Sequence, residues 1–393
     1  MSEFNFYAKK PSEDYHKVDM WLVVSILLLW GLGIFTLFAC TKNHFANNSF
    51  GYVKRQLFSS AIGFVLFFIF LFTDIKMIRK SIGLIVAVSF VLCLLTFIKP
   101  LSIEKNGARR WLKMPGNFSF QPSELVKFAV VLFLANFFDK QERLENPEEK
   151  NLLPSVIVLI VFVSVVILQK DMSTSILILL IGILLFFVAG QKILWLIPFS
   201  ILAIPTAFIA MFLEQYRIKR ILGWLNPEQY NSSLNYQARA AKTAISAGGI
   251  WGSGIGSGLV KINSIPENQA DYIFAGWAEA MGFVGVIAYI LLLLFFAWRG
   301  YKSAMNCSDR FSSYAGFGCV SVIFMQSLVN IMVVCGLLPS TGIPLPFFSL
   351  GGSSIIVTLA MCGFILNTSR GEDSVEYLSE FDEVSLEDFS YLS

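Results

Sequence analysis

Long apolar runs separated by shorter polar segments form the basic pattern of this chain. A helix needs about 17–25 residues to cross a bilayer, and ten runs come close to that length. They lie near residues 20–40, 56–73, 82–98, 123–138, 152–168, 173–189, 194–213, 275–297, 313–335 and 353–369. The pattern predicts an all-α polytopic membrane protein of about ten transmembrane helices, with a large polar loop, 214–274, between helices 7 and 8.

Composition supports a membrane protein and excludes several kinds of site. Of the 393 residues, 55% are hydrophobic and 15% are charged, whereas soluble domains carry nearer a quarter charged residues. The six cysteines show no paired spacing, so neither a disulfide framework nor a zinc site is indicated. With only two histidines, His16 and His44, serine-histidine catalysis and haem ligation are not expected. The net charge of +3 does not indicate nucleic-acid binding.

The polar ends of the chain define its organisation. We expect a cytoplasmic N-terminal segment at 1–19, a membrane domain at 20–370 and an acidic cytoplasmic tail at 371–393. An even number of spans places both termini on one side, and the distribution of Lys and Arg mildly favours the cytoplasm. The loop 214–274 is then extracytoplasmic. The tail carries eight acidic and no basic residues, which predicts disorder or a docking strip for a cytoplasmic protein.

Basic residues gather in the loop 99–122, on the same side as the loop 214–274. They are Lys99, Lys105, Arg109, Arg110 and Lys113. The adjacent arginines suit bidentate contacts with phosphate. The alternative is that these side chains reach toward lipid headgroups.

Three charged residues follow at the edges of spans. Pro122 suits the first turn of a helix. Glu124 and Lys127 are three residues apart, so they share a helix face and can pair; such charges should face protein or water. Asp171, in the tight loop between the fifth and sixth spans, is interpreted first as a helix cap and second as a polar-site residue.

The loop 214–274 contains Tyr236-Gln237 and then a glycine-rich stretch, AISAGGIWGSGIGSG, at 244–258. No βαβ unit flanks it, so we interpret its glycines as turn and close-packing positions and not as a nucleotide loop. Three carboxylates lie at the end of this loop and at the start of the span that follows: Glu267, Asp271 and Glu279. A carboxylate before a membrane span is a functional candidate, although a helix N-terminus also favours one.

Irregular backbone is expected at 330–354, which holds three prolines and four glycines at membrane level. Such backbone is tolerated only where it is buried in protein or lines a cavity. We therefore expect this segment to share a cavity with the loops 99–124 and 214–274.

Taken together, these stretches resemble the SEDS (shape, elongation, division and sporulation) family. The matching pieces are NGARRWL (106–112), QPSELVK (121–127), Asp171, Tyr236-Gln237, GGIWGSGIG (248–256), IPENQADYIFA (265–275) with Glu279 and Gly282, and the segment 330–354. The pieces beside the second and last spans are more similar to the FtsW group than to the RodA group. The chain departs from the family pattern at Gln269-Ala270, Ala240-Ala241 and Leu350.

The resemblance implies a peptidoglycan glycosyltransferase that polymerises lipid II at the outer face of the cytoplasmic membrane and releases undecaprenyl diphosphate. Asp271 matches the family's essential loop aspartate, and we expect it to be the catalytic base. Arg109, Arg110 and Lys113 are expected to stabilise the leaving diphosphate, with Lys127 and Lys242 further back. The remaining expected substrate-binding residues are Glu124, Asp171, Gln237, Glu267, Glu279, Pro344, Pro346, Ser349 and Ser353.

The resemblance also implies partners, and the chemistry leaves one cofactor open. The expected partners are a class B penicillin-binding protein with transpeptidase activity and other division proteins, at the division septum. A divalent cation, Mg²⁺ or Mn²⁺, can share the phosphate charge, with Glu267, Glu279 and Asp171 as candidate contributors among which the sequence does not decide. The competing functions are a lipid II flippase or transporter and a non-catalytic division scaffold.

Overall fold

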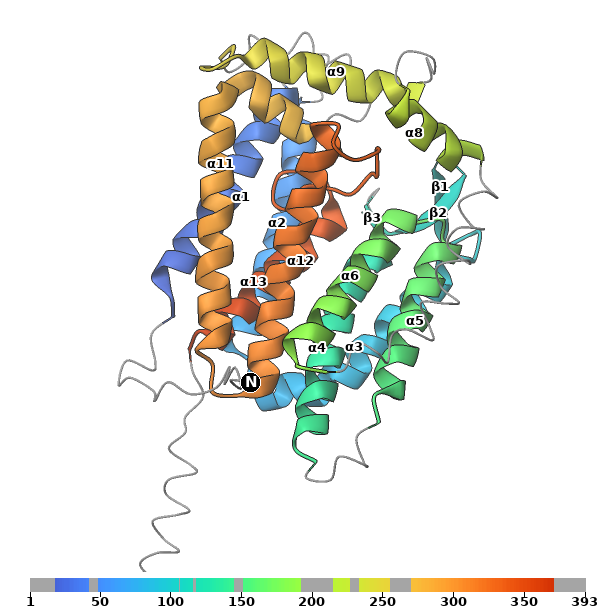
Figure 1. The fold of residues 1–393 in the computed structure, drawn as a ribbon, viewed down its shortest axis with the longest axis vertical. Coiled ribbons are helices and arrows are strands. Elements are labelled where there is room, and N and C mark those ends of the chain that lie inside the picture. Colours follow the sequence, from blue (N-terminus) through green and yellow to red (C-terminus); the bar gives the residue numbers. More distant parts are fainter. Residues whose placement is uncertain are drawn as a thin grey trace, which may run out of the picture.

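The structure, a computed structural model, describes residues 18–41, 49–105, 107–115, 118–144, 151–191, 215–226, 233–254 and 270–370. Long helices pack side by side, and two shorter helices and a small sheet lie toward one end of them (Figure 1).

The long helices are α1 (Met20–Thr41), α2 (Ser49–Phe72), α3 (Ile75–Leu95), α4 (Pro122–Glu142), α5 (Leu153–Leu168), α6 (Met172–Val188), α11 (Ile273–Met305), α12 (Arg310–Val334) and α13 (Gly352–Thr368). The shorter helices are α8 (Gln215–Leu225) and α9 (Ser233–Gly248). Three antiparallel strands, in the order β1-β2-β3, are Ser102–Lys105, Ala108–Lys113 and Ser119–Phe120.

The helices confirm a polytopic all-α membrane protein. Nine of the ten expected spans coincide with described helices, and the seventh, near 194–213, lies outside the described residues. By length and composition, five helices in the described part can cross a membrane, and α5, α6 and α13 are shorter apolar helices. The count of ten therefore stays a prediction.

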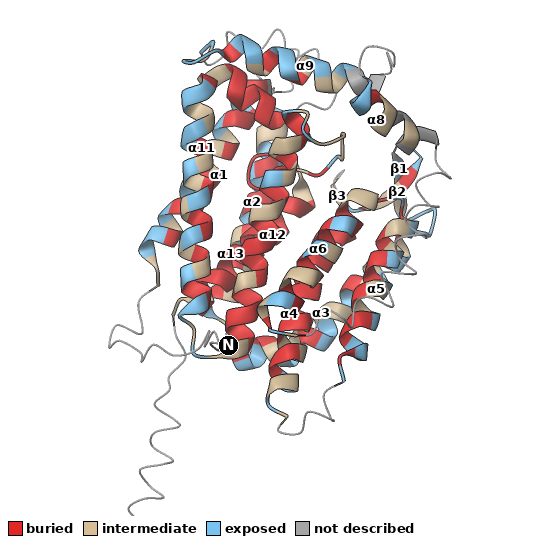
Figure 2. Ribbon diagram, viewed as in Figure 1, coloured by how far each residue is buried: buried red, intermediate tan, exposed pale blue. Residues whose placement is uncertain are grey.

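Helix α13 lies in the interior of the bundle, where it packs along α2. Two glycines permit the close approach: a Cβ at Gly363 would lie 2.2 Å from the Phe67 carbonyl oxygen, and one at Gly63 would lie 2.7 Å from Leu359. Small residues commonly serve this purpose between membrane helices. Figure 2 shows α13 mostly buried, whereas α1 and α11 carry many exposed residues on their outer sides. Exposed apolar side chains on these outer helices suit contact with lipid.

Helix α11 is broken at Gly282, which has φ 64° and ψ −165°. The turn that follows α9 supplies the hydrogen bonds that the broken helix lacks. The amide of Phe283 donates to the Gly249 carbonyl at 2.9 Å, and the amide of Gly254 donates to the Ala280 carbonyl at 3.2 Å. A Cβ at Gly252 would lie 2.2 Å from the Ala280 oxygen. The described glycines of the glycine-rich stretch therefore are turn and close-packing positions, as expected.

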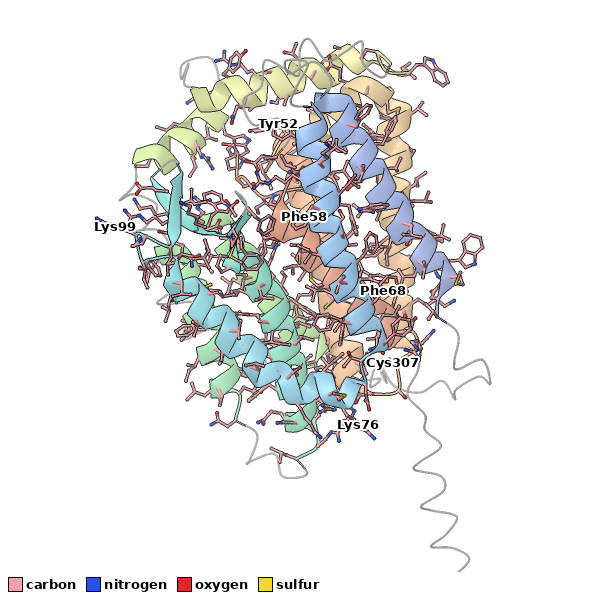
Figure 3. All side chains as sticks on the ribbon, turned by 180° about the vertical axis from the view of Figure 1, so that it is seen from behind. Tyr52, Phe58, Phe68, Lys76, Lys99 and Cys307 are labelled. Atoms are coloured by element: carbon pink, nitrogen blue, oxygen red, sulfur yellow. The ribbon has the colours of Figure 1, made fainter. Side chains whose placement is uncertain are left out.

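The two ends of the helical domain lie on one side of the molecule. The Asp19 amide donates to Ser369 Oγ at 3.3 Å, and the Asp19 carboxylate pairs with Arg299 at 2.6 Å. Figure 1 shows α8 and α9 at the opposite end. In Figure 3, Tyr52 and Lys99 lie toward the α8 and α9 end, and Lys76 and Cys307 lie near the other.

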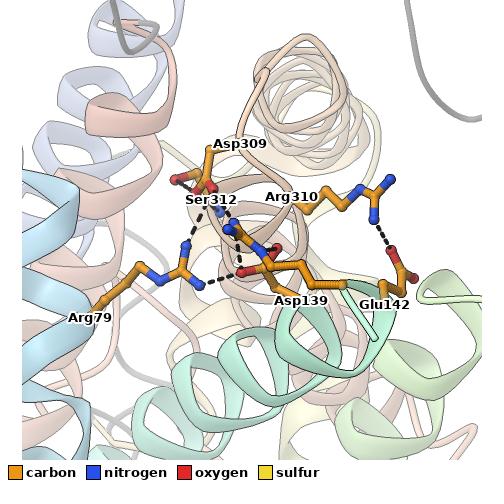
Figure 4. A network of polar contacts seen from close by, with 7 residues as sticks. Arg79, Asp139, Glu142, Asp309, Arg310 and Ser312 are labelled. Atoms are coloured by element: carbon orange, nitrogen blue, oxygen red, sulfur yellow. Dashed lines mark hydrogen bonds and ion pairs between the residues drawn. The ribbon is translucent and has the colours of Figure 1, made fainter. Parts of the chain in front are cut away.

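A network of ion pairs joins three elements at the end of the bundle where Asp19 and Ser369 lie (Figure 4). Arg79 of α3 pairs with Asp139 of α4, and at 3.4 Å with Asp309, which caps α12. Arg143 pairs with Asp139 at 3.1 Å. The Asp139 side chain is fully buried, so several hydrogen-bonded partners are needed to keep its charge there. The network therefore fixes α4 relative to α3 and α12.

Candidate functional site

Residues 340–344, between α12 and α13, form a short irregular stretch that we call the STGIP segment. Its first two carbonyl groups are contacted by two different helices. Arg220 of α8 donates from Nη1 to the Ser340 oxygen at 2.9 Å, and Ser173 of α6 donates from Oγ to the Thr341 oxygen at 3.1 Å. These bonds satisfy carbonyl groups that no regular helix or strand would satisfy.

The later part of the STGIP segment is held by α12. Asn330 donates from Nδ2 to the Ile343 oxygen at 2.8 Å and to the Asp271 oxygen at 2.9 Å. Gln326 donates from Nε2 to the Pro344 oxygen at 2.9 Å. Asn330 thereby links the STGIP segment to the chain that enters α11.

The Asp271 carboxylate lies at this junction. Asp271 is partly exposed, and a Cβ at Gly342 would lie 3.4 Å from its Oδ2 atom. The N-cap residue of α11 is Tyr272, one position later. Asp271 therefore lies one position before the N-cap residue, at the N-terminal end of α11, and its side chain faces the STGIP segment.

Arg110 extends from β2 toward the start of α6. It donates from Nη2 to the Lys170 carbonyl at 2.6 Å, and its Nη1 lies 3.5 Å from the Asp171 carboxylate. Asp171 is buried, and it also accepts from Gln121 at 2.9 Å and from the Thr174 amide at 3.4 Å. Asp171 thus caps α6, as predicted, and also orients Arg110.

The structure separates the two adjacent arginines. Arg109 pairs with Glu104 of β1 at 2.9 Å, on an exposed part of the sheet, because neighbouring residues of a strand point to opposite faces. Lys113 is exposed at the end of β2. Of these three cations, Arg110 is the one that contacts Asp171.

Glu124 and Lys127 form the predicted ion pair, at 2.8 Å and almost completely buried. Lys127 also donates to Oε1 of Gln326, whose amide contacts the STGIP segment. A buried pair of this kind needs extra hydrogen bonds to offset its desolvation. These residues support the STGIP segment from inside the bundle.

Three further predicted residues lie in the interior of the helix bundle, close in sequence to the STGIP segment. Pro346, Ser349 and Ser353 are buried. Ser349 Oγ accepts from the Leu345 amide at 2.8 Å, and its carbonyl accepts from Gln56 at 3.0 Å. These contacts hold the backbone that follows the STGIP segment.

The loop 214–274 and the first part of α11 supply the remaining predicted residues. Gln237 is partly exposed on α9, and Lys242 lies over Gly336, where a Cβ would be 2.6 Å from its Nζ. Glu279 is buried at the junction of α9 and α11, where its carbonyl accepts from Ser253. Glu267 lies outside the described residues.

Arg220 was missed by sequence analysis. Burial and the nearby charge of Arg110 lower the pKa of Arg220, and the Asp271 charge opposes that change. Burial and the same aspartate raise the pKa of the Tyr272 phenol to about 12. Arg220 therefore lies within electrostatic reach of both Arg110 and Asp271. One basic residue in a long polar loop gives no sequence signal of such a position.

No group of three or more His, Cys, Asp and Glu side chains suited to a metal occurs among the residues that the structure describes. The oxygens of Asp171 are already hydrogen-bonded. A cation held jointly by protein and substrate stays a prediction.

Comparison with known proteins places this geometry in context. A relative from Borreliella burgdorferi, named probable peptidoglycan glycosyltransferase FtsW, is 35% identical over 353 residues, which are 89% of this chain and 95% of the relative. Stage V sporulation protein E of Bacillus subtilis is 33% identical over 356 residues, covering 90% and 97%.

Solved structures have the same fold. A chain from a peptidoglycan synthase complex, described for its coordination of polymerisation and crosslinking, aligns with a TM-score of 0.74 at 27% identity, covering 90% of this chain and 98% of that chain. The rod shape determining protein RodA of Thermus thermophilus aligns with a TM-score of 0.66 at 25% identity, covering 90% and 97%.

The family model for FtsW, RodA and SpoVE, described as cell cycle protein, matches residues 18–374. This match covers every described element, including the STGIP segment, Asp271 and Arg110. The chain is a multi-pass membrane protein that belongs to the FtsW, RodA and SpoVE family, the SEDS family that its motifs resemble.

Proposed function

We propose that this protein is a peptidoglycan glycosyltransferase that polymerises lipid II. The observation that carries the proposal is the position of the Asp271 carboxylate at the STGIP segment. Arg220, which donates to the same segment, lies within electrostatic reach of Asp271 and of Arg110. A carboxylate near one guanidinium group, with a second guanidinium group near the first, suits a reaction that removes a proton and releases a diphosphate. Relatives named as peptidoglycan glycosyltransferases support it.

The reaction requires one proton acceptor and stabilisation of one leaving group. The 4-hydroxyl oxygen of the acceptor sugar forms a bond to the anomeric carbon of the donor sugar, while the bond from that carbon to the lipid diphosphate breaks. Asp271 takes the hydroxyl proton, since an alkyl hydroxyl does not ionise at neutral pH. The electron pair of the broken bond leaves on the diphosphate, and this single displacement inverts the anomeric centre.

Arg110 is the best placed of the predicted cations to stabilise the diphosphate. Its guanidinium group is held by Lys170 and Asp171, so little side-chain freedom remains to be lost when substrate binds. Arg109 and Lys113 lie on more exposed parts of the sheet, where they suit attraction of an anionic substrate.

A divalent cation, where the reaction uses one, would be held by Asp271 together with substrate phosphates. Mg²⁺ commonly binds through one or two carboxylates plus phosphate oxygens. Asp171 is the less suitable ligand, because Gln121, Thr174 and Arg110 already engage its oxygens.

The cellular setting follows from the same proposal. The face that carries α8, α9 and Asp271 is extracytoplasmic, both termini are cytoplasmic, and the partner is a class B penicillin-binding protein with transpeptidase activity. A similar chain belongs to a complex described for polymerisation and crosslinking. The named FtsW relatives favour a division role at the septum over a RodA-like elongation role.

Reconstitution tests the proposal against its two alternatives. Purified protein in liposomes, supplied with lipid-linked disaccharide, should form glycan chains, and the partner transpeptidase should increase the yield. Translocation of the lipid without chain formation would indicate a flippase. Neither activity, from a folded protein with its partner present, would indicate a scaffold.

A further inference from the structure

We propose that Arg220 of α8 and Arg110 of β2 together form a two-guanidinium site for the diphosphate group of the lipid-linked substrate. This inference rests on the proposed function and adds a substrate-contacting residue to it. The alternative is a purely structural role, in which Arg220 only holds α8 against the STGIP segment through its hydrogen bond to Ser340.

The backbone of the STGIP segment brings the relevant groups together. Ser340 accepts from Arg220 at 2.9 Å, and Thr341 accepts from Ser173 at 3.1 Å, two residues after the aspartate that holds Arg110. Gly342 is the next residue, and a Cβ there would lie 3.4 Å from the Asp271 carboxylate. Three consecutive residues thus connect Arg220, the start of α6 and the proposed base.

The charges explain why this arrangement suits an anion. Burial and, second, the charge of Arg110 lower the pKa of Arg220, so the two guanidinium groups are near enough to repel each other. A diphosphate between them would relieve that repulsion, and each guanidinium group can form two parallel hydrogen bonds to phosphate oxygens. Two arginines also match the two phosphorus centres of the group that leaves.

The position of the two arginines relative to Asp271 suits the arrangement of leaving group and proton acceptor in the proposed reaction. A diphosphate on these arginines would place the anomeric carbon next to it, on the side of the carboxylate that takes the proton. Arg220 would then bind the substrate before reaction and stabilise the charge that develops on the leaving group.

Helix α8 also offers a control variant for a purely structural role of Arg220. Trp224, one turn after Arg220 and on the same face of the helix, donates from Nε1 to the Gly336 carbonyl at 3.0 Å. Trp224→Phe removes this second bond between α8 and the chain that leads to the STGIP segment, but changes no charge. Arg239→Ala removes an exposed charge from α9 and controls for net charge.

The test measures binding of inorganic diphosphate to the purified full-length protein, by thermal stabilisation and by competition with lipid-linked disaccharide. Loss of a hydrogen bond to a charged group costs about 1.5–3 kcal/mol, so Arg220→Ala should weaken diphosphate binding about ten- to a hundredfold. Arg220→Lys should recover part of the affinity. Arg220→Gln keeps a donor for Ser340 and should be as weak as the alanine variant.

Two results would overturn the inference. One is unchanged diphosphate affinity in folded Arg220→Gln or Arg220→Lys protein. The other is a loss of diphosphate affinity in Trp224→Phe equal to that in Arg220→Ala, which would give Arg220 a purely structural role. Because diphosphate binding does not require turnover, its dependence on Arg220 can be measured even if the protein makes no glycan. Glycan synthesis by variants with unchanged diphosphate affinity would remove this site alone.

Discussion

The neighbours of each charged residue decide what its removal should do. Arg110 is held at a fixed place by Lys170 and Asp171, whereas Arg109 pairs with Glu104 on an exposed part of the sheet. Exposed ion pairs contribute about 0–1 kcal/mol. Two residues that are adjacent in sequence should therefore differ widely in their effect on activity.

We expect Arg110→Ala to reduce polymerisation about ten- to a hundredfold, from the loss of charge-assisted contacts with substrate. Arg109→Ala should change it less than about fivefold. Initial rates with purified variants at several concentrations of lipid-linked disaccharide would measure both. Equal effects of the two substitutions would contradict the assignment of Arg110 to the site.

The sequence predicted the contacts of individual residues where both partners are close together in the chain. The spacing of Glu124 and Lys127 predicted their pairing, because both lie on one face of one helix, and the position of Asp171 predicted its capping role. Arg220 was missed because its contact, Ser340, is 120 positions away in sequence. Such a contact depends on the packing of α8 against the chain after α12.

Among the elements, α9 and α11 meet at a junction where backbone packs directly against backbone. The turn at 248–254 bonds to α11 on both sides of Gly282. The part of α11 before the break begins just after Asp271. The turn thus fixes the helix that positions the proposed base.

Two glycines of this turn provide a matched test. Both have positive φ, 84° at Gly252 and 54° at Gly249, but only at Gly252 would a Cβ meet backbone, 2.2 Å from the Ala280 oxygen. Left-handed backbone costs either alanine about 1–2 kcal/mol, and overpacking should add about 1–3 kcal/mol for Gly252→Ala. In thermal melts in detergent, Gly252→Ala should therefore melt clearly below Gly249→Ala. Equal melting temperatures would argue against a tight junction.

Hydrophobic runs predicted the membrane helices well, since burial and lipid contact both require long apolar segments. The same reasoning treated 99–122 and 214–274 as loops. The structure places the sheet β1-β2-β3 in the first and α8 and α9 in the second. These elements are short and polar, so they depend on packing against the bundle and give little signal in a hydropathy pattern.

On the scale of the whole molecule, the domain has two distinct ends. The two ends of the described helical domain, at Asp19 and Ser369, lie at one end with the network of Arg79 and Asp139, and α8 and α9 lie at the other. The expected topology places the second end outside the cytoplasmic membrane.

Cysteine labelling tests this orientation. In a background without native cysteines, Arg239→Cys on α9 should react with a membrane-impermeant reagent in intact cells. Lys140 is exposed near the C-terminal end of α4, at the end of the bundle away from α9. Lys140→Cys should react only after permeabilisation. The reverse pattern would place the proposed site on the cytoplasmic side and would contradict polymerisation at the outer face.

The proposed reaction depends on one proton acceptor, so Asp271→Asn gives the most direct test. The variant keeps the size of the side chain but cannot take a proton, and polymerisation by purified protein should fall at least about a hundredfold. Its thermal melt should match the wild type, and added Mg²⁺ or Mn²⁺ should not restore activity, as it would if Asp271 only bound a metal. Near-wild-type glycan synthesis by folded Asp271→Asn protein would contradict the account.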